Sequence, residues 1–314
     1  MNDLKINFPI DKFQKLIIDI GWESLDDWFE FWNNKKNILS IDQFWKNKVN
    51  DDWIWGLALP LLSQAYKFKN NFYDRKIIGI SALPGTGKTT LGKWLEAISL
   101  KLNFKIAVIS IDDFYLPSEE MNLAVKHNPW NVSRGFPGSH SVKLMHEKIL
   151  NWKINGELKV PVLDKSLRNG LGDRSHWRSD NPDLLILEGW FLGIEPFSED
   201  VNYQDNKLEN LTFHESDYVR KIQKNLNDYL DTWILLDNIW HLKPLKFEYM
   251  NIWKSNQEKE MFLKKGKALQ DKKLSNFLRM LNVSIPHESF DFIDSYALLL
   301  IDQERNLVKA GLNH

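Results

Sequence analysis

The chain contains no cysteine, and this absence removes several kinds of chemistry at once. Its 314 residues offer no thiol to form a disulfide, act as a nucleophile or bind zinc through sulfur. Long hydrophobic runs are also missing, because no apolar stretch reaches the ~18 residues that a transmembrane helix needs. The first residues, MNDLKINFPIDKF, carry early acids and no apolar core, unlike a secretory signal peptide. We therefore expect a cytoplasmic protein.

A large net charge is absent as well. Lysine and arginine number 41 against 42 acidic residues, which gives a net charge of −1. This balance gives no reason to expect nucleic acid or a membrane surface as the main partner, although a local basic cluster could bind a phosphorylated small molecule. The length suffices for one large domain with a full core, or for one domain with an appendage.

Two regions of different character follow one another along the chain. Residues 1–75 are rich in aromatic side chains at helical spacing, such as Trp28 and Trp32 after a capping-box-like start at Ser24. We predict a helical N-terminal extension here, either as a layer packed against the rest or as an interaction surface. In residues 76–314, short apolar runs alternate with helical patterns, which predicts an α/β domain with a mostly parallel sheet covered by helices on both faces.

The predicted elements of the second region are defined by their apolar patterns. We predict strands at 76–82, 104–111, 183–189, 232–237 and 295–302. Helices are predicted at 89–102, 217–230 and within a charged region of about 245–280. The polar segment 114–140 and the acidic segment 194–217 are predicted as loops.

The strongest motif lies between the first predicted strand and the helix that follows it. It has the spacing of a Walker A phosphate-binding loop, with alanine at the first glycine position, and comprises Ala82, Leu83, Pro84, Gly85, Thr86, Gly87, Lys88, Thr89 and Thr90. The glycines let the backbone wrap around phosphates with its amide hydrogens pointing inward, and the helix N-terminus adds a positive dipole end. We expect Lys88 to reach the β- and γ-phosphates of ATP and the Thr89 hydroxyl to bind Mg²⁺.

Acidic residues end two of the predicted strands, at the edge where ligands of open α/β sheets bind. Asp112 and Asp113 follow the second strand, and one of them can accept the proton of a substrate hydroxyl and orient that hydroxyl for in-line attack. The other can reach Mg²⁺ through water or cap a turn. Glu188 ends the third strand and fits the Walker B role, a contact with Mg²⁺ directly or through its water, or it merely caps the strand end.

The segment around these aspartates, SIDDFYLP at 110–117, resembles the S-x-D-x-F-Y stretch of the uridine kinase, phosphoribulokinase and pantothenate kinase group of P-loop kinases. That resemblance implies a P-loop kinase fold and favours Asp112 as the base and as a contact of Mg²⁺. Segments at 134–140, 160–174 and 188–193 are similar to D-glycerate 3-kinase of photosynthetic organisms. The similarity runs from about residue 76 to residue 312, and the helical N-terminus has a weaker counterpart.

The resemblance implies ATP-dependent phosphorylation of D-glycerate to 3-phosphoglycerate, with Mg²⁺. The substrate carboxylate requires a planar bidentate donor, and Arg134 and Arg174 both lie in segments that we expect as loops near the strand ends. His140, Asp164 and Lys165 could hold the substrate hydroxyls or the loop itself.

The residues leave other readings open. The acceptor could be a nucleoside or a pantothenate-like alcohol, or the chain could be a non-catalytic ATP-binding protein. Ser141 stands where the glycerate kinase segment usually has an acid. Lys264, Lys265 and Lys267 could close over ATP as a lid, or they could lie on a solvated helix face.

Overall fold

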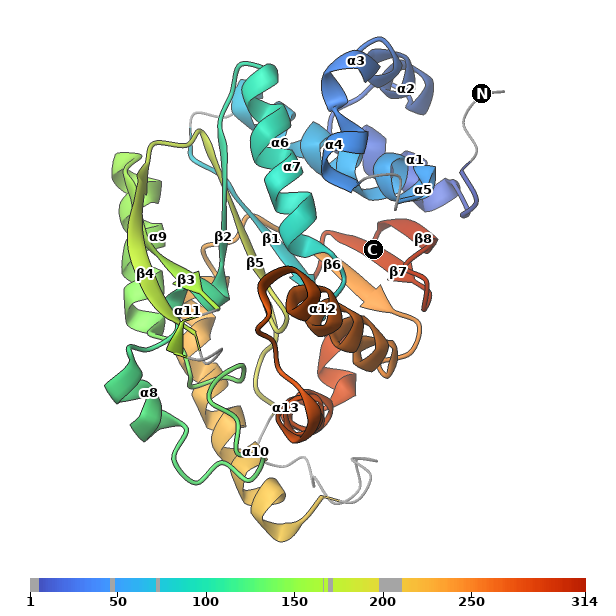
Figure 1. The fold of residues 1–314 in the computed structure, drawn as a ribbon. Helices are drawn as coiled ribbons and strands as arrows, with labels where there is room; N and C mark the ends of the chain where they lie inside the picture. Colours follow the sequence, from blue (N-terminus) through green and yellow to red (C-terminus); the bar gives the residue numbers. More distant parts are fainter. Residues whose placement is uncertain (1–5, 46–48, 72–73, 166, 169–171, 198–210) are drawn as a thin grey trace.

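The computed structural model describes residues 6–45, 49–71, 74–165, 167–168, 172–197 and 211–314 (Figure 1). Its centre is a six-stranded sheet in the order β2-β5-β1-β6-β7-β8. The strands are β1 Ile77–Ala82, β2 Ile106–Ser110, β5 Leu184–Gly189, β6 Asn238–Pro244, β7 Ala297–Ile301 and β8 Leu307–Leu312. The first five are parallel and β8 runs antiparallel to β7, which confirms the mostly parallel sheet predicted from the sequence.

The strands are apolar on both sides because helices cover both faces of the sheet. All six residues of β1 are buried. Ile78 and Ile80 point into one core and Ile77 into the other, so the run lacks the alternation of a half-exposed strand.

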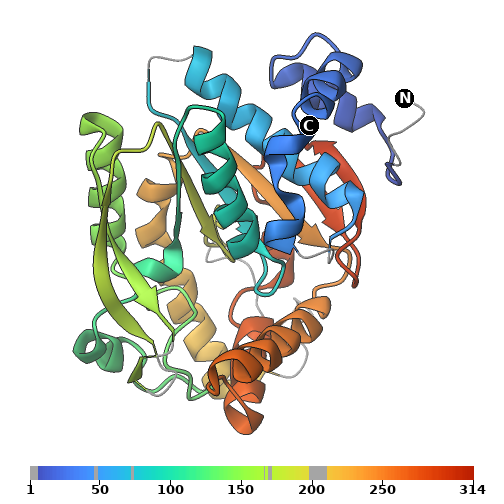
Figure 2. The same cartoon turned by 45° about the horizontal axis from the view of Figure 1, so that its top comes forward.

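The helices form two layers and a third group at the edge where the parallel strands end (Figures 1 and 2). One face of the sheet carries α1 Asp11–Asp19, α2 Leu25–Asn33, α3 Lys36–Leu39, α4 Ile41–Trp45, α5 Asp51–Trp53, the π-helix η1 Ile54–Ala58, α6 Leu59–Asn71 and α7 Lys88–Lys101. The other face carries α9 Val142–Asn155, α10 Phe213–Leu226 and α11 Leu230–Trp233. At the edge lie α8 Ser118–Ala124, α12 Tyr249–Lys265 and α13 Asp271–Val283, together with the short helices η2 Ile111–Phe114 and η5 His287–Asp291. The short helix η4 Asn227–Tyr229 joins α10 to α11 on the second face.

The N-terminal helices share one core with the sheet. The Ser24 hydroxyl caps α2 by accepting the backbone N–H of Asp27, as the sequence predicts. Trp28 and Trp32 are fully buried, and both indole N–H groups donate to the hydroxyl oxygen of Ser63, at 2.7 and 2.8 Å. The aromatic face of this extension is therefore packed core.

Three of the sequence-based assignments are wrong in detail. The strand predicted at 232–237 is instead the end of α11 and a turn, and the strand of this region is β6, whose apolar pattern is interrupted by His241 and Lys243. The segment 114–140, predicted as a loop, contains the short helix α8. The acidic loop predicted at 194–217 lies partly outside the described residues, and its last part begins α10.

A second, two-stranded antiparallel sheet had no clear sequence signal. It pairs β3 Leu158–Asp164 with β4 Asp173–Asp180, and β4 has the largely polar sequence DRSHWRSD. None of the helices in the described part of the chain has both the length and the apolar character needed to cross a lipid bilayer.

Candidate active site

The predicted phosphate-binding loop leaves β1 and enters α7 at Lys88. Gly85 and Gly87 have positive φ angles of 82° and 103°, which favour glycine. A Cβ on Gly85 would also lie 2.7 Å from the backbone carbon of Trp253 on α12, so the close approach of this helix requires glycine. The loop therefore has the backbone shape that presents amide groups and a helix N-terminus to an anion.

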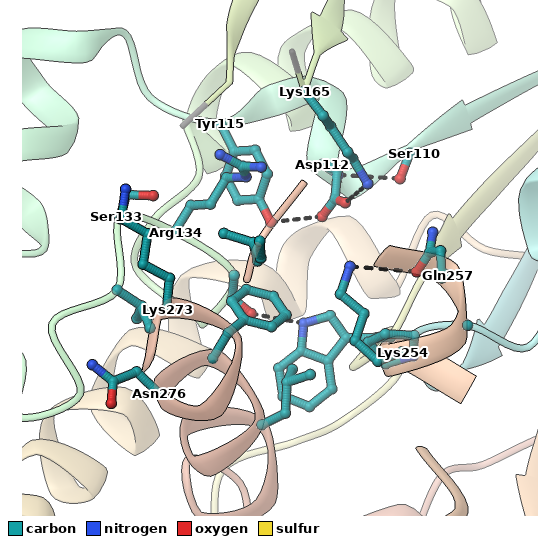
Figure 3. A pocket seen from close by; sticks show the side chains of 18 of the residues that line it. Ser110, Asp112, Tyr115, Ser133, Arg134, Lys165, Lys254, Gln257, Lys273 and Asn276 are labelled. Atoms are coloured by element: carbon teal, nitrogen blue, oxygen red, sulfur yellow. Dashed lines mark hydrogen bonds and ion pairs between the residues drawn. The ribbon is translucent and has the colours of Figure 1, made fainter. Parts of the chain in front are cut away.

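A cavity of about 1090 Å³ opens beside this loop, at the C-terminal ends of the parallel strands. Cavities that hold drug-sized ligands measure roughly 300–1,000 Å³, so this one has room for a nucleotide with a small second molecule. Figure 3 shows how side chains from several elements converge on it. Of the residues predicted from the sequence, its walls contain Pro84, Gly85, Gly87, Lys88, Thr89, Thr90, Asp112, Arg134, Lys165 and Glu188.

Lys88 and Glu188 face each other at the base of the cavity. The Lys88 ammonium donates to the carbonyl oxygens of Ala82 at 2.5 Å and Leu83 at 3.1 Å, and lies 3.9 Å from the Glu188 carboxylate. Burial lowers the pKa of Lys88 and raises the pKa of Glu188, and the opposite charge of each partner offsets part of the other's shift. The register of β5 with β1 and β2 brings Glu188 to this point, beside both the loop and Ser110.

Asp112 and Asp113 have different surroundings. The Asp112 carboxylate lines the cavity, where it accepts the Tyr115 hydroxyl at 2.7 Å and the Lys165 ammonium at 2.9 Å. Burial opposes its ionisation, but the charge and hydrogen bond of Lys165, with the Tyr115 bond, hold the pKa of Asp112 well below its ordinary value. Asp112 is therefore ionised at neutral pH.

Asp113 lies outside the cavity wall and binds backbone instead. Its carboxylate accepts the N–H of Ser110 at 2.9 Å, which closes a capping box around η2, and the N–H of Leu163 on β3 at 3.0 Å. It thereby ties the segment that carries Asp112 to the small β3–β4 sheet. Burial raises the pKa of Asp113.

The two predicted substrate arginines lie on either side of a wall. Arg134 lines the main cavity, with its guanidinium 5.9 Å from the centre of the Tyr115 ring. Arg174 lies within strand β4 and not in the loop that the sequence suggests. It faces a much smaller cavity of about 20 Å³, which adjoins Tyr115, Ser133 and Arg134.

His140 and Asp164, also predicted to contact the substrate, are not among the residues that line the main cavity. His140 is buried and stacks on the Tyr115 ring with centroids 4.4 Å apart, and its Nδ1 lies 2.8 Å from the Tyr229 hydroxyl. Burial lowers the pKa of His140 to about 4, so this ring is neutral at pH 7. His140 thus supports the side chain that holds Asp112. Asp164 is the last residue of β3.

Several lining residues had no recognisable sequence signal. They come from α12, α13, the segment before Arg134 and the turn between β7 and β8, and include Lys126, His127, Ser133, Lys254, Lys272, Lys273, Asn276 and Arg305. Helical periodicity marks α12 and α13 as helices, but not which of their lysines face the loop.

The lysines that the sequence suggested for a lid lie elsewhere. Lys264 is 75% exposed and pairs with Glu260 at 3.5 Å, and Lys267 is exposed. The side chain of Lys265 lies outside the described residues. From this region, Lys254, Lys272 and Lys273 line the cavity instead.

The donor set of the site fits a hard cation held together with phosphate oxygens. Thr89, Asp112 and Glu188 offer hydroxyl and carboxylate oxygens on one cavity wall. Within the described ranges, no three carboxylate or imidazole side chains gather closely enough to hold a metal ion by themselves. Mg²⁺ bound through one or two carboxylates and substrate phosphates does not need such a cluster.

A parallel sheet with a phosphate-binding loop after a central strand, and acids at the ends of two neighbouring strands, defines a P-loop kinase. The chain is 30% identical over 217 residues to the uncharacterized kinase mug58 of Schizosaccharomyces pombe. The aligned region covers 64% of this chain and 76% of that protein. The chain therefore belongs to the P-loop kinase family of that protein, and it is a phosphotransferase.

Two further comparisons agree with this assignment. The chain is 33% identical over 216 residues to the chloroplastic D-glycerate 3-kinase of Arabidopsis thaliana, covering 64% of this chain and 45% of the plant protein. The solved structure of D-glycerate 3-kinase from Cryptococcus neoformans has the same fold, with a TM-score of 0.68 at 23% identity over 80% of this chain and 96% of that one. No family model matches the chain.

Proposed function

We propose that the protein is an ATP-dependent kinase that phosphorylates D-glycerate to 3-phosphoglycerate. The observation that carries this proposal is the joint arrangement of Asp112 and Arg134 around Tyr115. The tyrosine hydroxyl bonds the carboxylate, and its ring lies beneath the guanidinium. Asp112, the proposed base, and Arg134, the proposed carboxylate ligand, thus line the same cavity as the phosphate-binding loop.

In the proposed reaction, the acceptor hydroxyl oxygen forms a bond to the γ-phosphorus of ATP while the bond from that phosphorus to the leaving ADP oxygen breaks. The hydroxyl proton passes to the Asp112 carboxylate. Because the transition state of phosphoryl transfer is loose, orientation of the hydroxyl by Asp112 matters as much as its basicity. Lys165 keeps this carboxylate ionised and ready to accept the proton.

The phosphates of ATP would be held by the loop amides and Lys88. For this contact, the Lys88 ammonium exchanges its bonds to the loop carbonyls for bonds to the β- and γ-phosphates. Thr89, Glu188 and Asp112 would hold Mg²⁺, which neutralises charge that develops on the phosphate oxygens. Asp113 and His140 would hold the catalytic segment in place from behind.

The acceptor would be bound through its carboxylate by Arg134, because a guanidinium matches a carboxylate with two parallel hydrogen bonds. Of the two hydroxyls of glycerate, the one on carbon 3 is farther from the carboxylate. Binding of the carboxylate at Arg134 therefore favours presentation of the 3-hydroxyl to Asp112. The sequence relationship to the plant D-glycerate 3-kinase supports the same acceptor.

The test is ADP release by the purified protein with ATP, Mg²⁺ and a panel of acceptors: D-glycerate, L-glycerate, glycerol, pantothenate and uridine. We expect ADP release to depend on D-glycerate, and phosphorus NMR of the product to show the 3-phosphate. Faster turnover with uridine or pantothenate would reassign the acceptor. A rate of ADP release that no acceptor in the panel changes would indicate an ATP-binding protein without this kinase activity.

A further inference from the structure

Lys254 is a buried lysine on α12 that the reaction described above does not use. Its side chain is 10% exposed, and it lines the same cavity as the phosphate-binding loop. Figure 3 shows its ammonium pointing into the same cavity as Lys165 and Asp112, from the other side. The charges of these two residues also bear on the pKa of Lys254, which burial lowers.

The position of this ammonium is set by its neighbours on α12 and α13. It lies 2.5 Å from the Glu258 carboxylate, one helical turn further on, and donates to the Gln257 side-chain oxygen at 3.3 Å. The second oxygen of Glu258 accepts the backbone N–H of Leu269, at 2.8 Å, in the connection between the two helices. The Phe277 ring of α13 lies 5.2 Å from the ammonium.

The hydrogen-bond count leaves one donor for a ligand. An ammonium has three N–H donors, and two of those of Lys254 have protein acceptors, Glu258 and Gln257, among the residues that the structure describes. In Figure 3 the ammonium points into the cavity, so an anion bound there could accept the remaining donor.

A purely structural ion pair would not require this placement. Lys254 and Glu258 are four residues apart on one helix, and such a pair could support α12 equally well with both side chains in solvent, whereas these two are 10% and 5% exposed. Instead the pair is buried against the cavity, where Trp253 of the same helix also touches the loop at Gly85. The helix thus carries its lysine to the point where phosphates would bind.

We propose that Lys254 is a further catalytic residue, which donates a hydrogen bond to an oxygen of the phosphoryl group in transfer while Glu258 and Gln257 hold it in position. This inference rests on the proposed phosphoryl transfer from ATP, but not on glycerate as the acceptor. Lys88 and Lys254 would then contact the group from two sides, with Lys165 beside the base. Charge that develops on the equatorial oxygens is stabilised most by donors that are already in place.

The test compares variants of the full chain that separate charge at the cavity from stability of the helix. Lys254→Met with Glu258→Gln removes the ion pair without leaving a buried charge, and Lys254→Arg keeps the cation. Lys264→Met is the matched control, an exposed lysine of the same helix. Each variant is measured for thermal unfolding, for kcat with saturating ATP and D-glycerate, and for the Kd of ADP alone and of ADP with aluminium fluoride, a mimic of the phosphoryl group in transfer.

For the double variant we expect a fall in kcat of roughly 10²-fold, the scale of losing one positioned donor, and an equal loss of affinity for ADP with aluminium fluoride. The affinity for ADP alone should stay within threefold of wild type, Lys254→Arg should recover part of the loss, and Lys264→Met should behave as wild type.

Wild-type kcat and wild-type affinity for the mimic in the double variant would show that the ion pair only supports the helix. An equal loss of affinity for ADP alone would show that Lys254 holds the nucleotide and not the transferred group. Because the binding of ADP with aluminium fluoride needs no acceptor, it decides the role of Lys254 even if D-glycerate is not the substrate.

Discussion

At the scale of single residues, the site is organised around Tyr115, which joins three side chains of different roles. Its hydroxyl bonds Asp112, its ring lies 5.9 Å from the Arg134 guanidinium, and the same ring stacks on His140. His140 is in turn anchored by Tyr229. This buried and neutral histidine thus supports Tyr115, the contact shared by Asp112 and Arg134, although it is not among the described residues that line the main cavity.

Substitution of the two neighbouring aspartates should have different effects, mainly on kcat for Asp112 and mainly on stability for Asp113. Asp112→Asn should lower kcat by roughly 10²–10⁴-fold, the range for a positioned acid–base group, with ATP affinity little changed. Asp113→Asn replaces an acceptor of two backbone N–H groups and should lower the free energy of unfolding by about 1–3 kcal/mol, with a smaller loss of kcat. Steady-state kinetics and urea unfolding of both variants test this, and the reverse order of kcat losses would contradict it.

Lys165 should control the pH at which the base becomes protonated. In the wild type the pKa of Asp112 is depressed, so the base stays ionised and activity should not fall because of it between pH 7 and pH 5. Lys165→Met removes the cation that favours the carboxylate, while the burial that opposes ionisation remains, so the pKa of Asp112 should rise. The acid limb of kcat/KM against pH should therefore move to higher pH, and an unmoved limb would contradict this role of Lys165.

Arg134 should act on the substrate carboxylate alone. Loss of a charge-assisted pair costs ~1.5–3 kcal/mol, so Arg134→Ala should raise KM for D-glycerate by roughly 10–150-fold. Glycerol lacks the carboxylate, and its poor turnover should be nearly indifferent to the change. Steady-state kinetics with both substrates on both proteins tests this. An equal loss with glycerol would mean that Arg134 holds the loop or the nucleotide, and Arg174 would become the leading carboxylate ligand.

The site residues that can be predicted from the sequence are those whose chemistry is tied to a local motif. Lys88 and Glu188 were placed by a loop and by a strand end, and both lie in the cavity. His140 and Arg134 belong to one segment, and only the fold shows that Arg134 lines the cavity while His140 packs behind Tyr115. Nor could the sequence point to Lys254, because the meeting of α12 with the phosphate-binding loop is a tertiary contact.

At the scale of elements, the parallel strands with buried faces were the readily predicted part, and the polar ones were not. β1, β2 and β5 are nearly uninterrupted apolar runs and were found close to their true bounds. β6 contains His241 and Lys243, and β4 is mostly polar, so hydrophobic pattern alone could not show either. The hairpin of β3 and β4 nevertheless carries Lys165 to the base, which makes this weakly signalled element part of the proposed site.

The contact between the phosphate-binding loop and α12 leads to a prediction about Gly85. Alanine there would force a side chain into a positive φ of 82° and place its Cβ 2.7 Å from the backbone of Trp253. Gly85→Ala should therefore displace the loop or α12 and weaken ADP binding at least tenfold. Gly266→Ala is the control, because Gly266 also has a positive φ, of 65°, but has nothing within 4 Å of an added Cβ. It should cost about 1 kcal/mol of stability and leave the Kd of ADP, measured by calorimetry, unchanged.

At the scale of the whole molecule, the N-terminal helices and the sheet form one core on one side. The buried cluster that contains Trp28 and Trp32 continues through Ile78 and Ile80 of β1 to Trp240 of β6. Trp240 also donates its indole N–H to Gln64 of α6, at 2.8 Å. Composition distinguishes the helical extension from the α/β part, but it does not show whether the two unfold together, which depends on these packed contacts.

Ser63 provides a test of that coupling. Its hydroxyl oxygen accepts the indole N–H groups of both Trp28 and Trp32, and all three residues are fully buried. Ser63→Ala leaves two buried donors unpaired, at about 1–3 kcal/mol each, so it should lower the free energy of unfolding by roughly 2–6 kcal/mol. Ser284→Ala is the matched control, since the Ser284 hydroxyl is equally buried and has no partner among the described residues, and its loss should be neutral or stabilising.

If the shared core unfolds as a unit, the lower stability caused by Ser63→Ala must also apply to the nucleotide site at the phosphate-binding loop. In Ser63→Ala, tryptophan fluorescence and the loss of ADP binding should then follow one transition at a lower temperature than in wild type. Saturating ADP should raise that whole transition in both proteins, because a ligand that binds only the native state stabilises everything that unfolds with its site; at 100 times its Kd the gain is about 2.7 kcal/mol. A fluorescence transition that moves in Ser63→Ala while ADP binding persists to the wild-type temperature would instead show that the extension is a separate folding unit.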